Sequence, residues 1–260
     1  MSQKRRLYPS DLTDQQWDLI REKIPAARPG GRIRTTNIRR VVEAILYVTR
    51  TGLAWRYLPS EFPPWQTVYF YFSKWSEMGL WTEINLVFTK EVRTKLSKEP
   101  IPSLAIVDSQ STKAQYGERR GYDGAKKVRG RKRSIIVDAL GLIWSCEVHE
   151  ANITDPKGGL AALEKFPEKD RDRLTKIIGD SAYRWPFDFY AEKTFGLEVQ
   201  LIERKKTGTN MKPKRWIVER TFAWFNRFRR LSRDYERLTR NSEAMIYLAM
   251  ITILLRRLTA

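Results

Sequence analysis

The sequence of 260 residues contains a single cysteine, Cys146, and a single histidine, His149. One cysteine excludes an internal disulfide bond, and the two residues together exclude a zinc site built from several Cys or His ligands. Long apolar runs are also absent, since the longest, residues 244–255, is too short to span a bilayer and predicts a buried helix. The first ten residues lack the apolar core of a signal peptide, so a cytosolic protein without a membrane partner is expected.

Acidic residues are scarce, because 30 Asp and Glu stand against 49 Lys and Arg, which gives a formal net charge of +19. Two blocks hold most of the excess: residues 113–133 contain nine bases and two acids, and residues 204–237 contain twelve bases and three acids. A solvated basic surface explains scattered lysines better than it explains dense blocks. The charge pattern therefore favours a polyanionic partner, and nucleic acid in particular.

The first hundred residues predict a small all-helical N-terminal domain, residues 1–100. Apolar residues at helical spacing indicate helices within 12–24, over 37–51, and in two further segments near 65–79 and 81–97. The two central helices and the connection between them could form a DNA-binding helix-turn-helix, but the connection is longer than the usual turn. Core packing of these aromatic-rich helices remains the alternative.

The periodicity changes in residues 101–260, where short apolar runs predict a second domain with strands. The expected order is β, β, β, α, β, α, β, α, which is a mixed α/β sheet flanked by helices. The predicted strands lie at 104–109, in a hairpin over 133–149 and at 175–181 and 197–203, and the clearest helices lie at 155–166 and 213–237.

Two aspartates, Asp108 and Asp180, occupy matching places, since each ends a short apolar run and precedes a serine. Catalytic groups gather at strand ends in α/β sheets, so the pair predicts a shared site. A single aspartate at such a place is more often a helix cap or a turn former. The matched pair makes that alternative weaker.

The third acid, Glu219, stands among arginines in the predicted helix 213–237. At about 100° per residue, Arg215, Glu219, Asn226 and Arg230 fall on one helical face. The glutamate either forms a structural ion pair or faces the two aspartates. In the second case three carboxylates would supply hard oxygen ligands for Mg²⁺ or Mn²⁺, as an in-line phosphoryl transfer with two metal ions requires.

The segments LAIVDSQS, KIIGDSAYRW and RWIVERTFAWFNRFRRLSRDYE, with KKVRGRKRSIIVDALGL between the first two, resemble the DDE motifs of bacterial insertion-sequence transposases. Insertion-sequence family five and its relatives are the most similar group, and TGLAWRYLP and PPWQTVYFYFSKW are similar to the N-terminal domain of that family. The resemblance implies an RNase H-like catalytic domain in residues 101–260 behind a helical DNA-binding or dimerisation domain. It also implies that Asp108, Asp180 and Glu219 are catalytic and hold two Mg²⁺ ions, with Mn²⁺ able to substitute.

Relatives carry a Tyr and an Arg before the glutamate and a Lys after it. Arg215 and Trp216 match residues found in relatives, whereas Lys212 and Asn226 stand at the Tyr and Lys positions. Either Arg227 or Arg230 is therefore expected to supply the missing cation.

Both basic blocks are expected to contact the DNA backbone. Residues 126–133, KKVRGRKR, precede the second predicted strand and so lie beside the proposed site. Trp216 could stack on an unpaired base, although core packing is an equal alternative. The residues expected to contact DNA are Lys126, Lys127, Arg129, Arg131, Lys132, Arg133, Arg215, Trp216, Arg220, Arg227 and Arg230.

These features together predict a transposase that cuts the terminal inverted repeats of an insertion sequence and joins the 3′-hydroxyl to target DNA. Double-stranded DNA is the expected partner, bound by a homodimer or a larger assembly. Two alternatives remain: an RNase H-like nuclease or resolvase without strand transfer, and a non-enzymatic DNA-binding regulator derived from a transposase. His149 is expected to be a hydrogen-bonded structural residue.

Overall fold

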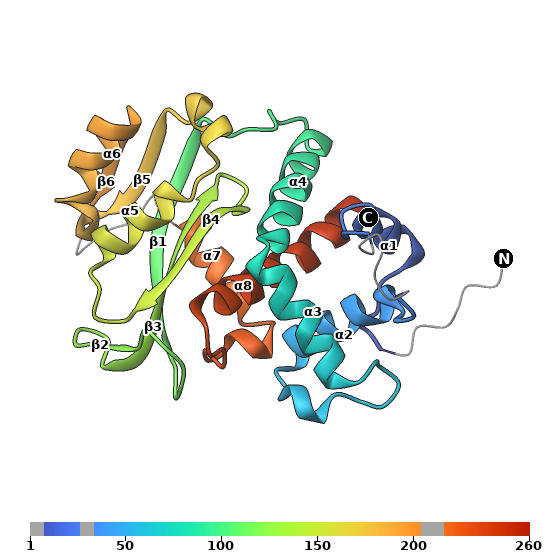
Figure 1. Cartoon of the computed structure of the whole chain (residues 1–260). Helices are drawn as coiled ribbons and strands as arrows, with labels where there is room; N and C mark the ends of the chain where they lie inside the picture. The colour runs from blue at the N-terminus through green and yellow to red at the C-terminus, as the bar shows by residue number, and fades with distance from the viewer. Residues whose placement is uncertain (1–7, 27–33, 204–215) are drawn as a thin grey trace.

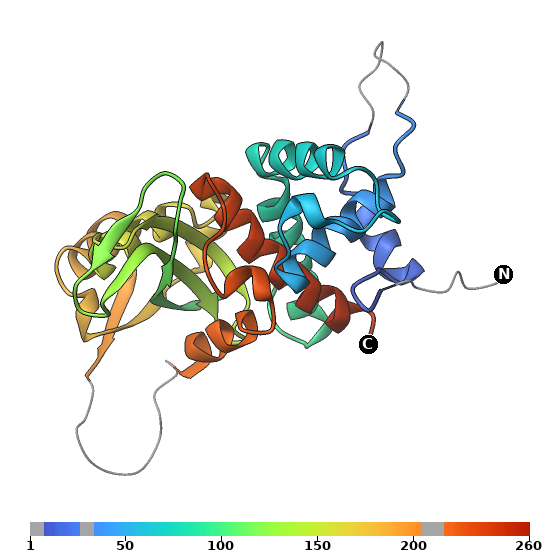
Figure 2. The ribbon, with the colours of Figure 1, turned by 90° about the horizontal axis from the view of Figure 1, so that it is seen from below.

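The computed structural model describes residues 8–26, 34–203 and 216–260. A mixed sheet with its own helices lies at one end of the molecule, and a bundle of N-terminal helices lies at the other (Figure 1). The helix α8 runs between them and belongs to both (Figure 2).

The N-terminal part is helical, as predicted. Thr13 begins the first helix with a capping box to Gln16, and Gly52, in the left-handed conformation at φ 74°, ends the second. The connection between the second and third helices contains a short 3₁₀ turn, so it is longer than a compact helix-turn-helix requires. The elements are α1 Asp14–Arg21, α2 Ile38–Thr51, η1 Trp55–Tyr57, α3 Trp65–Glu77 and α4 Leu80–Lys95.

The predicted mixed sheet is confirmed. Its strand order is β2-β3-β1-β5-β6, and β4 pairs with β3 beside β2. β1 is antiparallel to β3 and parallel to β5, which is in turn parallel to β6. The strands are β1 Leu104–Lys113, β2 Gly121–Asp123, β3 Val128–Asp138, β4 Ile143–Glu150, β5 Lys176–Asp180 and β6 Glu198–Ile202.

β1 is longer than its apolar run predicted, and β2 was not predicted. The polar residues from Asp108 to Lys113 continue as strand because β3 pairs with them along their whole length. Backbone pairing across the sheet therefore decides this extension, and side-chain hydrophobicity does not signal it.

Helices cover both faces of the sheet. The helices α5 Asp155–Glu164 and α6 Phe187–Phe195 lie on one face, with the 3₁₀ turns η2 Glu168–Arg173 and η3 Ser181–Tyr183 on the connections around β5. The helices α7 Trp216–Phe225 and α8 Thr239–Leu258 lie on the other face, with the 3₁₀ turn η4 Arg229–Leu231 between them.

The prediction of one long helix over 213–237 is wrong for the described residues. α7 ends at Phe225, and the chain then turns so that Phe228 and Leu231 reach the core. Arg230 consequently does not share a helical face with Glu219. Burial of these two apolar side chains opposes the straight helix that local periodicity favours.

The buried helix predicted at 244–255 is confirmed as the central part of α8. It packs against α2, α3, α4 and β4, so one apolar cluster extends from the N-terminal helices to the sheet. No helix in the described part of the chain has the length and hydropathy needed to cross a membrane.

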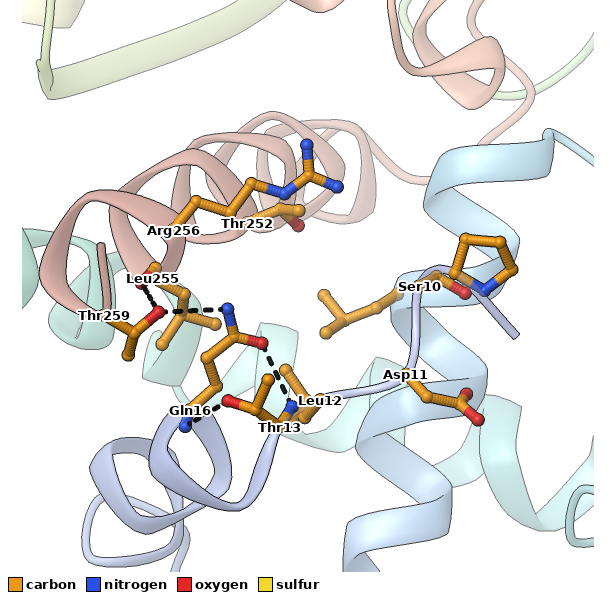
Figure 3. A pocket seen from close by; sticks show the side chains of 11 residues that line it. Ser10, Asp11, Leu12, Thr13, Gln16, Thr252, Leu255, Arg256 and Thr259 are labelled. Atoms are coloured by element: carbon orange, nitrogen blue, oxygen red, sulfur yellow. Dashed lines mark hydrogen bonds between the residues drawn. The ribbon is translucent and has the colours of Figure 1, made fainter. Parts of the chain in front are cut away.

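The first and last helices also meet. Gln16 of α1 donates a hydrogen bond from Nε2 to Oγ1 of Thr259, 3.3 Å away, beside a cavity of about 320 Å³ that Arg256 also lines (Figure 3). This cavity contains none of the acidic residues singled out in the sequence.

Candidate active site

Asp108 and Asp180 lie on neighbouring strands inside the sheet, Asp108 within β1 and Asp180 at the end of β5. Ile106 of β1 pairs with Ile178 of the parallel strand β5, so continuing this register by two residues brings Asp108 level with Asp180. Neighbouring strands lie about 4.8 Å apart. The two aspartates predicted from sequence are therefore brought together by a single pair of strands.

The side chains of both aspartates point to the face of the sheet that α7 and α8 cover. Ile106 and Ile178 pack in the core with α7 and α8, whereas Val107 packs with α5 and α6. Because side chains alternate along a strand, Asp108 and Asp180 take the same face as Ile106 and Ile178.

Glu219 lies in the first turn of α7, on that same side of the sheet. It lines an open pocket of about 400 Å³ together with Gln110 of β1, which by alternation takes the same face as Asp108, and with Asn226, just beyond the end of α7. Lys126, from the turn between β2 and β3, lines the pocket as well. The pocket thus places a carboxylate and an ammonium group beside the strand that carries Asp108.

The local backbone orients the two aspartates. The amide nitrogen of Ser109 donates to Oδ1 of Asp108 at 2.7 Å, and that of Ala182 donates to Oδ1 of Asp180 at 3.0 Å. Each carboxylate thus accepts a hydrogen bond from a nearby backbone amide, which restricts the side chain before any ligand binds.

Three of the acidic side chains act on the buried phenol of Tyr183. Burial raises the pKa of the Tyr183 phenol well above its usual value, and the carboxylates of Asp108, Asp155 and Asp180 raise it further.

Divalent metal ions suit these side chains, since carboxylate oxygens are the ligands that Mg²⁺ and Mn²⁺ prefer. Within the described residues, however, no three Asp, Glu, His or Cys side chains are grouped closely enough to hold a metal ion. The structure therefore brings the three acids to one face without gathering them into a complete ligand set.

A second polar cluster lies behind β1, on the face that α5 covers, and was missed from sequence. Lys132 donates to Oδ1 of Asp155 at 2.9 Å, and Ser109 donates to the same oxygen at 2.7 Å. On the same strand, Ser111 donates to Asp123 at 2.6 Å. The alternating serines of DSQS are the signal that could have indicated a hydrogen-bonded face.

These contacts lower the pKa of Asp155. Burial alone would raise it, but the hydrogen bonds from Lys132 and Ser109 and the charge of Lys132 outweigh that effect. Lys132 is itself buried, so the prediction that it contacts DNA is not supported.

Arg131 is also not placed to contact DNA, because its side chain is completely buried. Its guanidinium forms an ion pair with Asp234 at 3.2 Å and donates to Oγ of Ser242 at 2.9 Å. It also donates to the backbone carbonyls of Glu118, Glu236 and Arg237. Arg131 therefore ties β3 to the segment that precedes α8.

Arg133 and Arg230 are buried as well, so the prediction of DNA contact is corrected for both. Arg133 donates to the carbonyl of Leu231 at 2.9 Å, and burial lowers its pKa. Arg230 pairs with Glu236 at 2.7 Å and donates to the carbonyl of Leu53 at 3.0 Å. Fully desolvated side chains of this kind have no access to a phosphate.

The other predicted DNA contacts are distributed unevenly. Lys126, Lys127, Arg129 and Arg227 are exposed, and Trp216 is 43% exposed. Arg220 is partly buried and donates to the carbonyl of Leu140 at 3.0 Å. Arg215 lies outside the described residues.

His149 is buried and hydrogen-bonded, as predicted. Its Nε2 lies 3.0 Å from Oγ of Ser134, and its Nδ1 lies 2.9 Å from the carbonyl oxygen of Glu150. Burial is the main cause that lowers its pKa. These contacts are those of a structural residue.

Comparison with known proteins gives two family matches. Residues 12–85 match the model described as "Putative transposase of IS4/5 family", and residues 99–254 match the model described as "Transposase DDE domain". The second match covers more than half of the chain and includes all three acids.

Curated relatives give shorter matches. The chain is 35% identical over 80 residues to "Uncharacterized protein y4sN" of Sinorhizobium fredii, which covers 31% of this chain and 64% of that protein. It is 29% identical over 115 residues to "Putative transposase for insertion sequence element IS402" of Burkholderia cepacia, which covers 42% of this chain and 54% of that protein. The chain thus spans less than two thirds of the length of both relatives.

The family match also settles the fold class. A DDE domain has an RNase H-like fold, and the mixed sheet with helices on both faces, preceded by a helical region, agrees with it. The predicted fold is confirmed.

Proposed function

Because this chain belongs to the DDE transposase family, as its motifs predicted, we propose that it cuts the ends of an insertion sequence and joins the freed 3′-hydroxyl to target DNA. The observation that carries the proposal is the arrangement of the acids. Asp108 and Asp180 are level on neighbouring parallel strands, and Glu219 lines a pocket over the same strand and the same face.

Asp108, Asp180 and Glu219 are proposed to hold the divalent ions that DDE enzymes use, two Mg²⁺ ions with Mn²⁺ as a substitute. Such ions, when bound, would activate the attacking hydroxyl and stabilise the leaving oxygen. The protein's own contribution is to present three carboxylates from a rigid sheet and a helix, and the backbone amides at Ser109 and Ala182 orient two of them.

The exposed bases near the pocket are proposed to bind the DNA backbone. Lys126 lines the pocket beside Glu219, and Lys127, Arg129 and Arg227 are exposed close by in sequence. Arg215 stays in this proposal on its sequence alone. These bases would offset the repulsion between the acidic site and a phosphate.

The helical N-terminal domain, residues 1–100, is proposed to bind DNA or to mediate dimerisation. Its match to a transposase family model supports this assignment. Cutting two ends and joining them to one target favours a homodimer or a larger assembly on double-stranded DNA, acting in the bacterial cytosol.

The test is an end-cleavage and joining assay. Labelled duplexes carrying the DNA that flanks the gene are incubated with target plasmid and Mg²⁺, using wild type, Asp108→Asn and Glu219→Gln. Wild type is expected to give joined products, and each variant to lose at least about 100-fold in rate because an acidic ligand is gone. Glu192→Gln, an exposed acid on α6, serves as the matched control.

The outcomes separate the alternatives. Cutting without joining would assign a nuclease or resolvase, and binding without cutting would assign a DNA-binding regulator. Full activity in either acidic variant would overturn the proposed site.

A further inference from the structure

The residue that follows Glu219 is held in an unusual stack. The guanidinium carbon of Arg220 lies 4.6 Å from the ring centre of Trp216 and 5.0 Å from that of Trp224. These residues are four apart along α7, so they form one stripe on the helix. Arg257 of α8 extends the stack, with its guanidinium carbon 4.9 Å from the Trp224 ring.

The stack is also attached to the turn between β3 and β4. Arg220 donates from Nη2 to the carbonyl of Leu140 at 3.0 Å, and its Nε is buried. The next residue, Thr221, donates from Oγ1 to the carbonyl of Gly141 at 2.8 Å. α7 is therefore joined to the sheet through two successive side chains.

Gly141 permits this close approach. Its φ is +78°, and a Cβ placed there would meet Oγ1 of Thr221 at 2.8 Å and the ring of Trp224 at 3.2 Å. Any side chain at Gly141 would push the turn away from α7.

α7 consequently has three distinct sides. Ile217, Val218 and Phe225 are buried in the core, and Glu219 faces the pocket with Asn226 close beyond the helix end. The remaining side carries the stripe of Trp216, Arg220 and Trp224. A ten-residue helix has little stability of its own, so its rotation depends on such contacts.

We propose that Arg220 is a positioning residue. It fixes the rotation of α7 about its axis and so orients the Glu219 side chain toward Asp108 and Asp180. This inference rests on the proposed function of Glu219. It replaces the DNA contact predicted for Arg220, because a guanidinium between two indole rings, bonded to a carbonyl, is committed to the protein.

Substitution of Arg220 by lysine distinguishes a positioning contact from a phosphate contact. Lysine keeps the charge of Arg220 but loses the planar group that stacks on both rings. A phosphate contact would tolerate Arg220→Lys better than a positioning contact would. Arg240→Lys, at an exposed arginine 3.7 Å from Glu77, is the matched control.

The test measures Mn²⁺ binding by electron paramagnetic resonance on the full chain with flanking-sequence duplex, next to the cleavage rate and the DNA affinity. Arg220→Lys is expected to weaken Mn²⁺ binding and to slow cleavage by roughly 10- to 100-fold each, the range seen when a group that orients a metal ligand is lost. The DNA dissociation constant and its salt dependence are expected to stay at the wild-type values.

A second pair of variants separates positioning from general stability. Trp224→Phe keeps an aromatic face for Arg220 and is expected to bind Mn²⁺ like wild type, whereas Trp224→Leu is expected to resemble Arg220→Lys. If all variants lower the melting temperature but leave Mn²⁺ binding unchanged, Arg220 is only structural and the inference is wrong.

Two further outcomes are decisive. In Arg220→Gln, which removes the charge, a weaker DNA affinity with a salt slope reduced by about 1 would make Arg220 a phosphate contact and overturn the inference. Full cleavage by Glu219→Gln would overturn the proposed function itself, whereas an inactive Glu219→Gln beside a normal Arg220→Lys would overturn only the positioning role.

Discussion

Residues 126–129 and 131–133 are neighbouring halves of one basic run, separated by Gly130, yet they face different surroundings. Lys126, Lys127 and Arg129 are exposed, whereas residues 131–133 are all buried. The difference begins where β3 enters the sheet between β1 and β4, at Arg131. Charge density therefore predicts the class of partner, and strand pairing selects the residues that can reach it.

The second basic block repeats this division. Arg227 is exposed, but Arg230, three residues later, pairs with Glu236 in the interior. Buried arginines satisfy carbonyls and acids of the protein, so they contribute to folding and have no free group for DNA. Three experiments test this difference between exposed and buried basic residues.

The largest effect is expected for Arg131→Ala. Removing this side chain leaves Asp234 and several backbone carbonyls buried without their donor, which costs about 3–5 kcal/mol of unfolding free energy. Urea denaturation followed by circular dichroism measures it. Arg129→Ala, two residues earlier and exposed, is the control and should change stability by less than about 0.5 kcal/mol. Equal losses in the two variants would refute the division.

The exposed residues of the basic run are expected to affect DNA binding and not stability, and the effect is smaller. The double variant Lys127→Ala, Arg129→Ala should fold normally but bind duplex DNA more weakly, with the slope of log affinity against log salt reduced by about 2. Fluorescence anisotropy at several salt concentrations measures this. Lys169→Ala, an exposed base outside both blocks, is the control. An unchanged slope would mean that this part of the run does not contact phosphates.

The smallest effect concerns His149 of β4, which lies opposite Lys132 of β3 in the register of the two strands. Burial, the largest cause, and the charge of Lys132 lower the pKa of His149, and they outweigh the opposite effect of the Glu150 carbonyl and of Glu147. The folded state thus favours the neutral ring. This stabilisation is present above the unfolded pKa of about 6.5 and is lost as the pH falls through the lower folded value.

Chemical denaturation of wild type and His149→Gln over the range from about pH 7 to 5 tests this. The stability advantage of wild type over the variant should shrink as the pH falls. A constant difference over that range would show that His149 does not titrate with folding.

Much of the fold follows from local sequence. Apolar periodicity located the helices of the N-terminal part, and short apolar runs located β1, the hairpin of β3 and β4, β5 and β6. The failures occurred where distant contacts override local preference. α7 ends at Phe225 because Phe228 and Leu231 are drawn into the core, and β1 continues past Asp108 because β3 pairs with it.

The candidate site likewise contains residues that the sequence indicated and contacts that it did not. Asp108 and Asp180 could be proposed because each follows a short apolar run, and Glu219 because it is an acid surrounded by arginines in the sequence. The contacts of Ser109, Asp155 and Lys132 behind the strand could not be found, since they join residues that are 23 to 46 positions apart. Arg220 was predicted to contact DNA because its hydrogen bond to the Leu140 carbonyl joins residues that are 80 positions apart.

The sequence by itself determined the basic character and the family and supplied the three acids proposed for the site, because composition, short apolar runs and motifs are local properties. Only the tertiary structure decided which bases are exposed and which face Glu219 takes. Those outcomes depend on which residues desolvate one another, and desolvation is a property of packed neighbours that no single segment specifies.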